Sequence, residues 1–343
     1  MAKDLKATGF EIVEKPGIFP KMGYAKYKNH RVGIMLVPKI PYLSDKNKIL
    51  FEISSLPKNQ GGGIRTADTV AEIKIALEKV KMRIVEVSNV KDLIDNIAPY
   101  TTINLKPGTY NLAEIKEVRS KYVERFDAEE NPNNPEYEYH IKNVTGLIIR
   151  GPKKGKAEIL TKPDYGWVFS VKNSENVTFE NLTLGHTTPG TCDGGVLQFN
   201  NSKVIRIKNC DLFGCGTVGL GINNVKDFRF DESIIRDCTD GILKMISSSD
   251  IRFFKSEFRD NKEFFGFNFA KSERITFDQC LISNNQTLYD DYFLFNDDAN
   301  SNEQIVVKNS TITGNKGKFM VSGRMTFENT KISGNKFTAI QEP

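Results

Sequence analysis

Apolar and polar residues alternate along much of the C-terminal half of the chain, and the alternation returns at a nearly constant interval. Seven segments share the order apolar-x-apolar-x-polar-small-x-apolar and begin at Val177, Ile205, Phe228, Ile251, Ile275, Ile305 and Met325. Their starts are 28, 23, 23, 24, 30 and 20 residues apart. The period of two predicts strands with one buried face, and the longer interval predicts a solenoid in which each repeat forms one turn.

Each turn is expected to hold three strands. One strand begins each segment, with Val177 and Phe179 facing inward, and a second follows a bend at Asn181–Leu182. A further short apolar stretch, such as Val218–Ile222, completes the turn. Helical repeats of similar length are excluded because no 3.6-residue period appears. The predicted fold class is therefore an all-β solenoid, a parallel β-helix with three strands per turn.

Two columns of polar and small residues support the stacking. Four residues after the starts lie Asn181, Asn209, Glu232, Lys255, Gln279, Asn309 and Asn329. Ten residues after the later starts lie Cys215, Cys238, Asn261, Asn285, Asn315 and Asn335. Asparagine suits tight bends because its side chain bonds the local backbone and it tolerates left-handed dihedral angles. At a strand spacing of about 4.8 Å, such residues are expected to form a hydrogen-bonded ladder.

The N-terminal part of the chain lacks this repeat. We predict a small α+β segment over residues 1–85 and the β-helix over residues 86–343, with clearly marked turns from 147 to 335. The spacing of apolar residues predicts helices over Thr69–Lys81 and Val90–Ile97. The acidic and proline-containing stretch Arg125–His140 is interpreted as an insertion loop between early turns.

The segment Thr102–Tyr110, which follows the second predicted helix, reads Thr-Ile-Asn-Leu-Lys-Pro-Gly-Thr-Tyr. It resembles the entry of pectin-lyase-like β-helix proteins, in which a short helix covers the first turn. The resemblance implies a right-handed β-helix with an N-terminal capping helix, and parallel crossovers in general prefer that hand. Members of this superfamily include pectate lyases, polygalacturonases and proteins without known activity, so the fold alone assigns no reaction.

One motif points to hydrolysis. Thr239-Asp240-Gly241-Ile242 is similar to the Asn-Thr-Asp-Gly-Ile element of polygalacturonases, although Cys238 replaces the asparagine. Asp240 is therefore a candidate catalytic acid, but such hydrolysis needs paired carboxylates. Phe264–Phe267 stands where the resemblance implies further acids and a histidine. Because the constellation is incomplete, the sequence leaves open whether the protein is an enzyme.

A second candidate site contains His186, Cys192 and Asp193. These residues flank or end a loop rich in threonine and glycine, and they could form a Cys–His nucleophilic pair or a metal site. The alternative is that the cysteines are small buried fillers, because four of the five occupy repeat positions that elsewhere hold Ser, Thr or Asn. Only Cys192 does not occupy one of these repeat positions. The odd cysteine count and the lack of CxxC spacing predict neither a complete disulfide framework nor a zinc site.

Acidic residues cluster between the fifth and sixth segments, at Asp290, Asp291, Asp297 and Asp298. Oxygen-rich loops of this kind bind Ca²⁺, and the alternative is an ordinary solvated loop. No other cofactor is indicated.

Arginines occupy equivalent outward positions on successive turns. Arg206, Arg229 and Arg252 form one row, and Arg236 and Arg259 form a second. Stacked rows of this kind can bind carboxylate, sulfate or phosphate groups along a polymer. The alternative is neutralisation by nearby acids, for which Asp231, Glu232, Asp211 and Glu257 are candidates. Nucleic acid is disfavoured because the aromatic residues mostly point inward and cannot stack on bases.

These observations favour a β-helix protein that binds an acidic polysaccharide or another anionic polymer on its solenoid face. The alternatives are a non-catalytic scaffold or surface protein with a protein partner, and a polysaccharide lyase or glycoside hydrolase. The net charge of +5 permits an anionic partner, and no apolar run approaches the roughly 20 residues that span a bilayer. The first residues lack the apolar core of a secretory signal, so a cytoplasmic protein and an exported one whose signal was removed both remain open.

Overall fold

A computed structural model describes residues 2–14, 17–18, 23–27, 30–37, 48–53, 64–78, 82–127, 137–162, 166–187, 194–214, 218–263, 265–287, 293–298 and 305–338. The chain divides into two compact units, Met1–Arg83 with Pro99–Thr101 and Ile84–Ala98 with Thr102–Pro343. The predicted boundary between the N-terminal segment and the β-helix, at residue 85, stays a prediction. None of the helices in the described part combines the length and apolar character that crossing a membrane requires.

The N-terminal unit is a small sheet with two helices. Its strands lie in the order β1-β3-β4-β5-β6, and β2 pairs with β4. The elements are α1 (Ala2–Ala7), β1 (Glu11–Glu14), β2 (Gly17–Ile18), β3 (Gly23–Tyr27), β4 (His30–Val37), β5 (Lys48–Ile53), β6 (Ile64–Ala67) and α2 (Val70–Glu78). Val70, Ile73 and Leu77 of α2 are buried with residues of the sheet, which confirms the helix predicted there.

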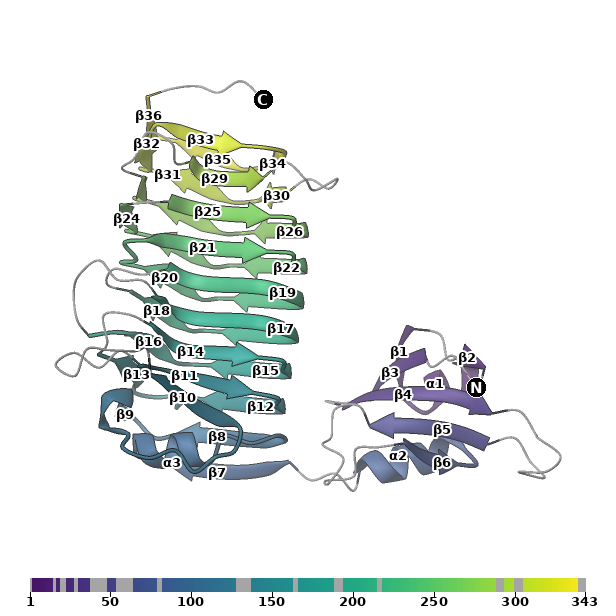
Figure 1. The fold of residues 1–343 in the computed structure, drawn as a ribbon. Coiled ribbons are helices and arrows are strands. Elements are labelled where there is room, and N and C mark those ends of the chain that lie inside the picture. Colours follow the sequence, from purple (N-terminus) through teal and green to yellow (C-terminus); the bar gives the residue numbers. More distant parts are fainter. Residues whose placement is uncertain are drawn as a thin grey trace. The chain divides into compact units, whose positions relative to one another are not determined.

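The second unit is a parallel β-helix whose turns stack along one axis (Figure 1). Each complete turn carries three strands, and like strands of successive turns form three columns. The first column contains β11 (Tyr137–Lys142), β14 (Gly166–Lys172), the first halves of β17 (Gly194–Lys208) and β19 (Val218–Asp231), β21 (Gly241–Ile246), β25 (Phe265–Ala270), β29 (Phe293–Asp298) and β33 (Phe319–Ser322).

The second column holds all seven segments that the repeat predicts. It contains β8 (Thr101–Leu105), β12 (Thr145–Arg150), β15 (Glu175–Glu180), the second halves of β17 and β19, β22 (Ser249–Phe254), β26 (Glu273–Asp278), β30 (Ile305–Lys308) and β34 (Met325–Glu328). The observed pairing of Val177 with Ile205 and of Ile305 with Met325 is the predicted register, despite unequal intervals along the chain.

The third column is formed by shorter strands. It contains β9 (Gly108–Asn111), β13 (Ala157–Thr161), β16 (Thr183–His186), β18 (Asp211–Phe213), β20 (Ile234–Arg236), β23 (Glu257–Arg259), β27 (Leu281–Ser283), β31 (Thr311–Thr313) and β35 (Lys331–Ser333). A fourth set of two-residue strands joins the later turns and contains β24 (Lys262–Glu263), β28 (Gln286–Thr287), β32 (Lys316–Gly317) and β36 (Lys336–Phe337). The prediction of an all-β solenoid with three strands per turn is confirmed.

The first turn differs from the others. It includes β7 (Arg83–Val87), α3 (Val90–Asp95), the 3₁₀ turn η2 (Leu112–Glu114) and β10 (Val123–Asp127). Asn89 caps α3 by accepting a hydrogen bond from the Asp92 amide, and Leu93 and Ile94 belong to the same buried core as the solenoid. The interpretation of Arg125–His140 as a loop was wrong at both ends, because β10 and β11 pair as antiparallel strands there. Residues 128–136 lie outside the described ranges.

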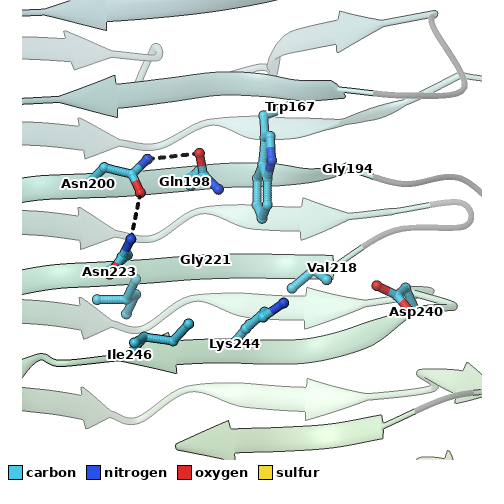
Figure 2. A pocket seen from close by; sticks show the side chains of 11 residues that line it. Trp167, Gly194, Gln198, Asn200, Val218, Gly221, Asn223, Asp240, Lys244 and Ile246 are labelled. Atoms are coloured by element: carbon cyan, nitrogen blue, oxygen red, sulfur yellow. Dashed lines mark hydrogen bonds between the residues drawn. The ribbon is translucent and has the colours of Figure 1, made fainter. Parts of the chain in front are cut away.

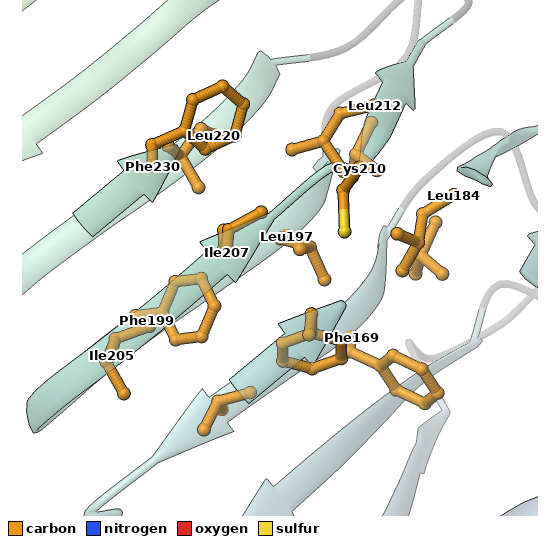
Figure 3. Packing of buried hydrophobic residues seen from close by; sticks show 14 of the residues in the cluster. Phe169, Leu184, Leu197, Phe199, Ile205, Ile207, Cys210, Leu212, Leu220 and Phe230 are labelled. Carbon is orange, nitrogen blue, oxygen red and sulfur yellow. The ribbon is translucent and has the colours of Figure 1, made fainter. Parts of the chain in front are cut away.

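The core consists of stacked apolar side chains (Figure 3). Inward residues of one turn lie directly above those of the next, and phenylalanine rings therefore touch along the axis. The Phe253 ring stacks on Phe277 at 4.5 Å and meets Phe258 edge-on at 5.5 Å, measured between ring centroids. Such contacts add to the hydrophobic gain of burying each ring.

The bends repeat as columns of left-handed residues. All seven residues of the predicted bend column, Asn181 to Asn329, have positive φ angles between 46° and 58°. A second left-handed column precedes the segment starts and contains Asn176, Val204, Asp227, Asp250 and Arg274. Val204 has a φ of 57° there, which is strained for a β-branched side chain. The second predicted column forms the expected ladder. Each Nδ2 donates to the next Oδ1 at 2.9 Å, from Asn261 through Asn285 and Asn315 to Asn335.

Candidate functional site

His186 ends β16 and is 2% exposed. Its Nε2 lies 2.8 Å from the carbonyl oxygen of Gly195, so the ring is held inside the solenoid wall. Cys192, Asp193 and Cys215 lie outside the described residues, and the proposed His–Cys pairing stays a prediction.

The described cysteines lie in the protein interior. Cys210, Cys238 and Cys280 are buried and form no disulfide. Burial raises the pKa of the Cys210 thiol to about 12 and that of Cys280 to about 11. A thiol that stays protonated is a poor nucleophile, and these cysteines act as small fillers of the core.

The first arginine row stacks as predicted. Arg206 pairs in register with Arg229, and Arg229 pairs with Arg252. Two of the three are neutralised by aspartates that the sequence analysis did not name. Arg206 Nη2 lies 2.7 Å from Asp227 Oδ1, and Arg252 Nη2 lies 3.3 Å from Asp278 Oδ2.

Arg229, between these two, is exposed and forms no ion pair with any described residue. It borders a surface depression with Arg252, Arg274 and Lys308, which alternate with three aspartates. The nearby Asp231, a predicted counter-ion, has its pKa raised by burial in spite of the surrounding arginines. The first row therefore presents one unpaired cation inside a mixed-charge surface.

Both arginines of the second row form ion pairs with acidic side chains of the protein. Arg236 holds Asp211 with two parallel hydrogen bonds of 2.9 and 2.8 Å, and it also contacts Asp237. Arg259 contacts Glu257 at 3.2 Å and Asp260 at 2.8 Å. Asp211 and Glu257 thus fill the neutralising role that the sequence analysis weighed as the alternative to ligand binding.

Of the four aspartates predicted as Ca²⁺ ligands, the structure describes the side chain of Asp297. Asp297 is 2% exposed and lies in the inward row that elsewhere holds Phe199, Ile222 and Met245. The side chain of Asp298 and both Asp290 and Asp291 lie outside the described residues. Within the described chain, no three histidine, cysteine or carboxylate side chains gather closely enough to hold a metal ion.

Trp167, which the sequence analysis did not single out, lies on the outer surface of the first column. The edge of its six-membered ring rests over two glycines of the next turns. A Cβ atom at Gly195 would lie 2.1 Å from Trp167 Cζ3, and one at Gly221 would lie 2.8 Å from Cη2. Figure 2 shows the indole extending along the solenoid axis across these strands. The two glycines are therefore needed where they stand, because any side chain would displace the indole.

Polar side chains surround Trp167 and form a groove. A cavity of about 330 Å³ is lined by Trp167, Gln198, Asn200, Val218, Asn223, Asp240, Lys244 and Ile246 together with glycines and Ile222. Asn200 Nδ2 donates to Gln198 Oε1 at 2.8 Å, and Asn223 Nδ2 reaches Asn200 Oδ1 at 3.4 Å (Figure 2). Asp240, the candidate acid of the sequence analysis, is half-buried at the edge of this cavity.

The groove continues toward the C-terminal turns. A second depression shares Lys244 and Ile246 with the first and adds Asn268, Ala270, Asn296, Asp297 and Ser322. Pairing places Gln198, Gly221, Lys244, Asn268, Asn296 and Ser322 in one outward row. We call these two depressions together the first-column groove. Amides are the commonest polar side chains that line it, and they can both donate and accept hydrogen bonds.

Ionisable residues cluster at the other end of this surface, on β11 and β14. His140 is buried and contacts Glu138, and Lys172 Nζ lies 3.2 Å from its Nδ1. Glu138 Oε2 also accepts a hydrogen bond from the Trp167 amide at 3.1 Å. Burial raises the pKa of Glu138, but the hydrogen bond to His140 and its charge outweigh burial, so the pKa is lowered. Burial, helped by the charge of Lys142, lowers the pKa of Lys172.

Comparisons with known proteins bear on the fold. The model of the right-handed β-helix region family matches residues 167–341, which confirms the predicted hand. A search of the curated proteins found no match. Similar solved structures include pectin methylesterase from Aspergillus niger, at 12% identity over 80% of this chain and 86% of that one, with a TM-score of 0.43. Pectate lyase C from Erwinia chrysanthemi is 14% identical over 77% and 82%, with a TM-score of 0.44. This likeness is one of fold and carries no information about activity.

Proposed function

The chain belongs to the right-handed β-helix family, and from this premise we propose that it binds an acidic polysaccharide along the first-column groove. The observation that carries the proposal is the position of Trp167 over Gly195 and Gly221, on an outward surface of amide side chains. The apolar C–H face of a pyranose ring packs against an aromatic ring, while its hydroxyl groups need partners that both donate and accept. An indole beside glutamine and asparagine meets both needs.

The repeat geometry of the groove suits a polymer. Outward residues recur at the strand spacing of about 4.8 Å, which is close to the length of one sugar residue in a chain. A polysaccharide lying along the axis would therefore meet equivalent positions turn after turn. Lys244, exposed in the middle of the row, supplies a cation for a carboxylate group.

Trp167→Ala is expected to weaken binding of a hexameric oligogalacturonate by about fivefold to 150-fold, because stacking on one aromatic ring contributes on the order of 1–3 kcal/mol. Isothermal titration calorimetry measures the affinity. Trp167 is the only tryptophan of the chain, so the fluorescence of the unaltered protein is expected to change on titration. Unchanged affinity of the variant would place the ligand elsewhere.

The arginine rows are the rival binding surface, and one double variant separates the two. Arg229→Ser with Arg252→Ser is expected to change the hexamer affinity less than about threefold, because Asp278 already holds Arg252 and exposed cations contribute little in salt. Loss of binding in this variant, with Trp167→Ala unaffected, would move the site to the arginine rows. The same samples are assayed for new reducing ends and unsaturated uronates, whose appearance would add hydrolase or lyase activity to binding.

A further inference from the structure

We infer that the polysaccharide surface extends past Trp167 onto the β10–β11 hairpin, where Phe126, Lys142 and Lys172 form a separate subsite for a uronate residue. This inference rests on the proposed function, since it concerns the same polymer. The subsite was not evident from the repeat, because the hairpin is antiparallel and interrupts the parallel solenoid pattern.

The hairpin places Phe126 on the outer surface. Antiparallel pairing sets Phe126 opposite Glu138 and Glu124 opposite His140, and residues directly opposite point to the same face. Phe126 stacks on the His140 ring with centroids 5.4 Å apart and planes 11° apart. It nevertheless stays 52% exposed. The imidazole lies against the phenyl ring, and the exposed part of the Phe126 side chain is the surface that a ligand would contact.

Phe126 and Trp167 are linked through one side chain. Glu138 lies opposite Phe126 on the neighbouring strand, and its carboxylate accepts the amide hydrogen of Trp167 one strand further on. Two strand spacings separate the strands that carry the two aromatic residues, roughly 9–10 Å. A polymer stacked on Trp167 can therefore reach Phe126 after about two sugar residues.

Two lysines lie beside His140, on which Phe126 stacks, and further along the strands than Phe126 or Trp167. Lys142 and Lys172 are paired in register on adjacent strands, so their like charges lie close together. Glu124 contacts Lys142, while Lys172 lies against His140. The lowered pKa of Lys172 agrees with a partly desolvated ammonium group beside a second one. The charge of Glu138 opposes this lowering only in part. A uronate carboxylate would add a second negative charge beside the Lys172 ammonium group, whereas a neutral sugar would not.

The experiment compares hexameric and dimeric oligogalacturonate by calorimetry in four variants. Phe126→Ala and Phe126→Leu are each expected to weaken the hexamer about fivefold to tenfold, because an aliphatic side chain cannot stack. The dimer is too short to reach Phe126 from Trp167, and it is expected to bind the two Phe126 variants as it binds the unaltered protein. Phe254→Ala on the second column is the matched control and is expected to change neither affinity. Trp167→Ala, which is expected to weaken the hexamer, shows how much affinity the groove itself contributes.

Three results would overturn the subsite. Full hexamer affinity in Phe126→Ala, with loss in Trp167→Ala, would leave the proposed function standing and remove the extension. Full affinity in Phe126→Leu alone would show that the ring is not a stacking surface. Failure of the unaltered protein to bind either oligomer would instead overturn the proposed function, and the subsite with it. Unchanged Trp167 emission in unliganded Phe126→Ala verifies that the hairpin change has not disturbed the groove.

Discussion

Phe253→Ala is expected to lower the free energy of unfolding by about 3–5 kcal/mol, the usual range for deleting a fully buried phenyl ring. Phe253 is completely buried and touches the rings of Phe228, Phe230, Phe258 and Phe277. The stacked turns on either side limit how far the neighbours can move into the space. Urea denaturation followed by far-ultraviolet circular dichroism measures the loss.

The adjacent residue provides the control. Phe254 is half-buried, and two cations lie over its ring, with the Arg252 guanidinium 4.3 Å and Lys255 Nζ 5.1 Å from the ring centre. Phe254→Ala is expected to cost less than about 1 kcal/mol, the contribution of an exposed cation–π contact. Equal losses in the two variants would contradict the assignment of Phe253 to the interior of the stack.

Asn285→Ala is expected to cost about 3 kcal/mol. The Oδ1 of Asn285 accepts a hydrogen bond from the Asn261 backbone amide at 3.2 Å, and its Nδ2 donates to the Phe258 backbone carbonyl at 2.8 Å. The alanine variant leaves both of these buried backbone groups without a side-chain partner, at about 1–3 kcal/mol each. The other ladder contacts are partly retained, since Asn261 Nδ2 also bonds Ile235 and Arg259. The same urea titration measures the effect.

Asn335 is the last member of the ladder. Replacing it tests whether the stability lost in Asn285→Ala comes from burial of the hydrogen-bonded groups or from the hydrogen bonds alone. Asn335 donates to the Ile312 carbonyl at 2.9 Å in the same way, but it is half-exposed. Water can replace its amide group, so Asn335→Ala is expected to cost less than about 1 kcal/mol. A loss as large as that of Asn285→Ala would mean that the fold depends on the length of the ladder rather than on its buried members.

The solenoid could be predicted because its core leaves a periodic trace. Every turn must supply apolar residues such as Val177 and Phe179 at fixed positions, and every bend must supply a residue that tolerates positive φ. The stacking of Arg229 on Arg206 followed from the same register. The partners of the first arginine row did not, because Asp227 lies 21 residues beyond Arg206 in the chain and reaches it only through the fold.

The groove left a weaker signal. Its outward row begins with Gln198, Gly221 and Lys244, which share no chemical type, so no pattern marks the row as one surface. The sequence feature that could have indicated the groove is the single tryptophan, with glycines one and two turns later. Its meaning depends on register, since only stacking brings Gly195 and Gly221 beneath the indole. The contact of Phe126 with His140 likewise depended on an antiparallel pair within a stretch interpreted as a loop.

The left-handed columns also govern which changes of chain length this protein can absorb. Deleting one residue within Ile251–Phe254 would turn Phe253 outward and move Lys255 away from the conformation that its column requires. Intervals of 30 and 20 residues, in contrast, separate Ile275, Ile305 and Met325 without disturbing the strand pairing. Length variation is therefore confined to the connections between strands. New surface can be gained there while every buried side chain keeps its neighbours.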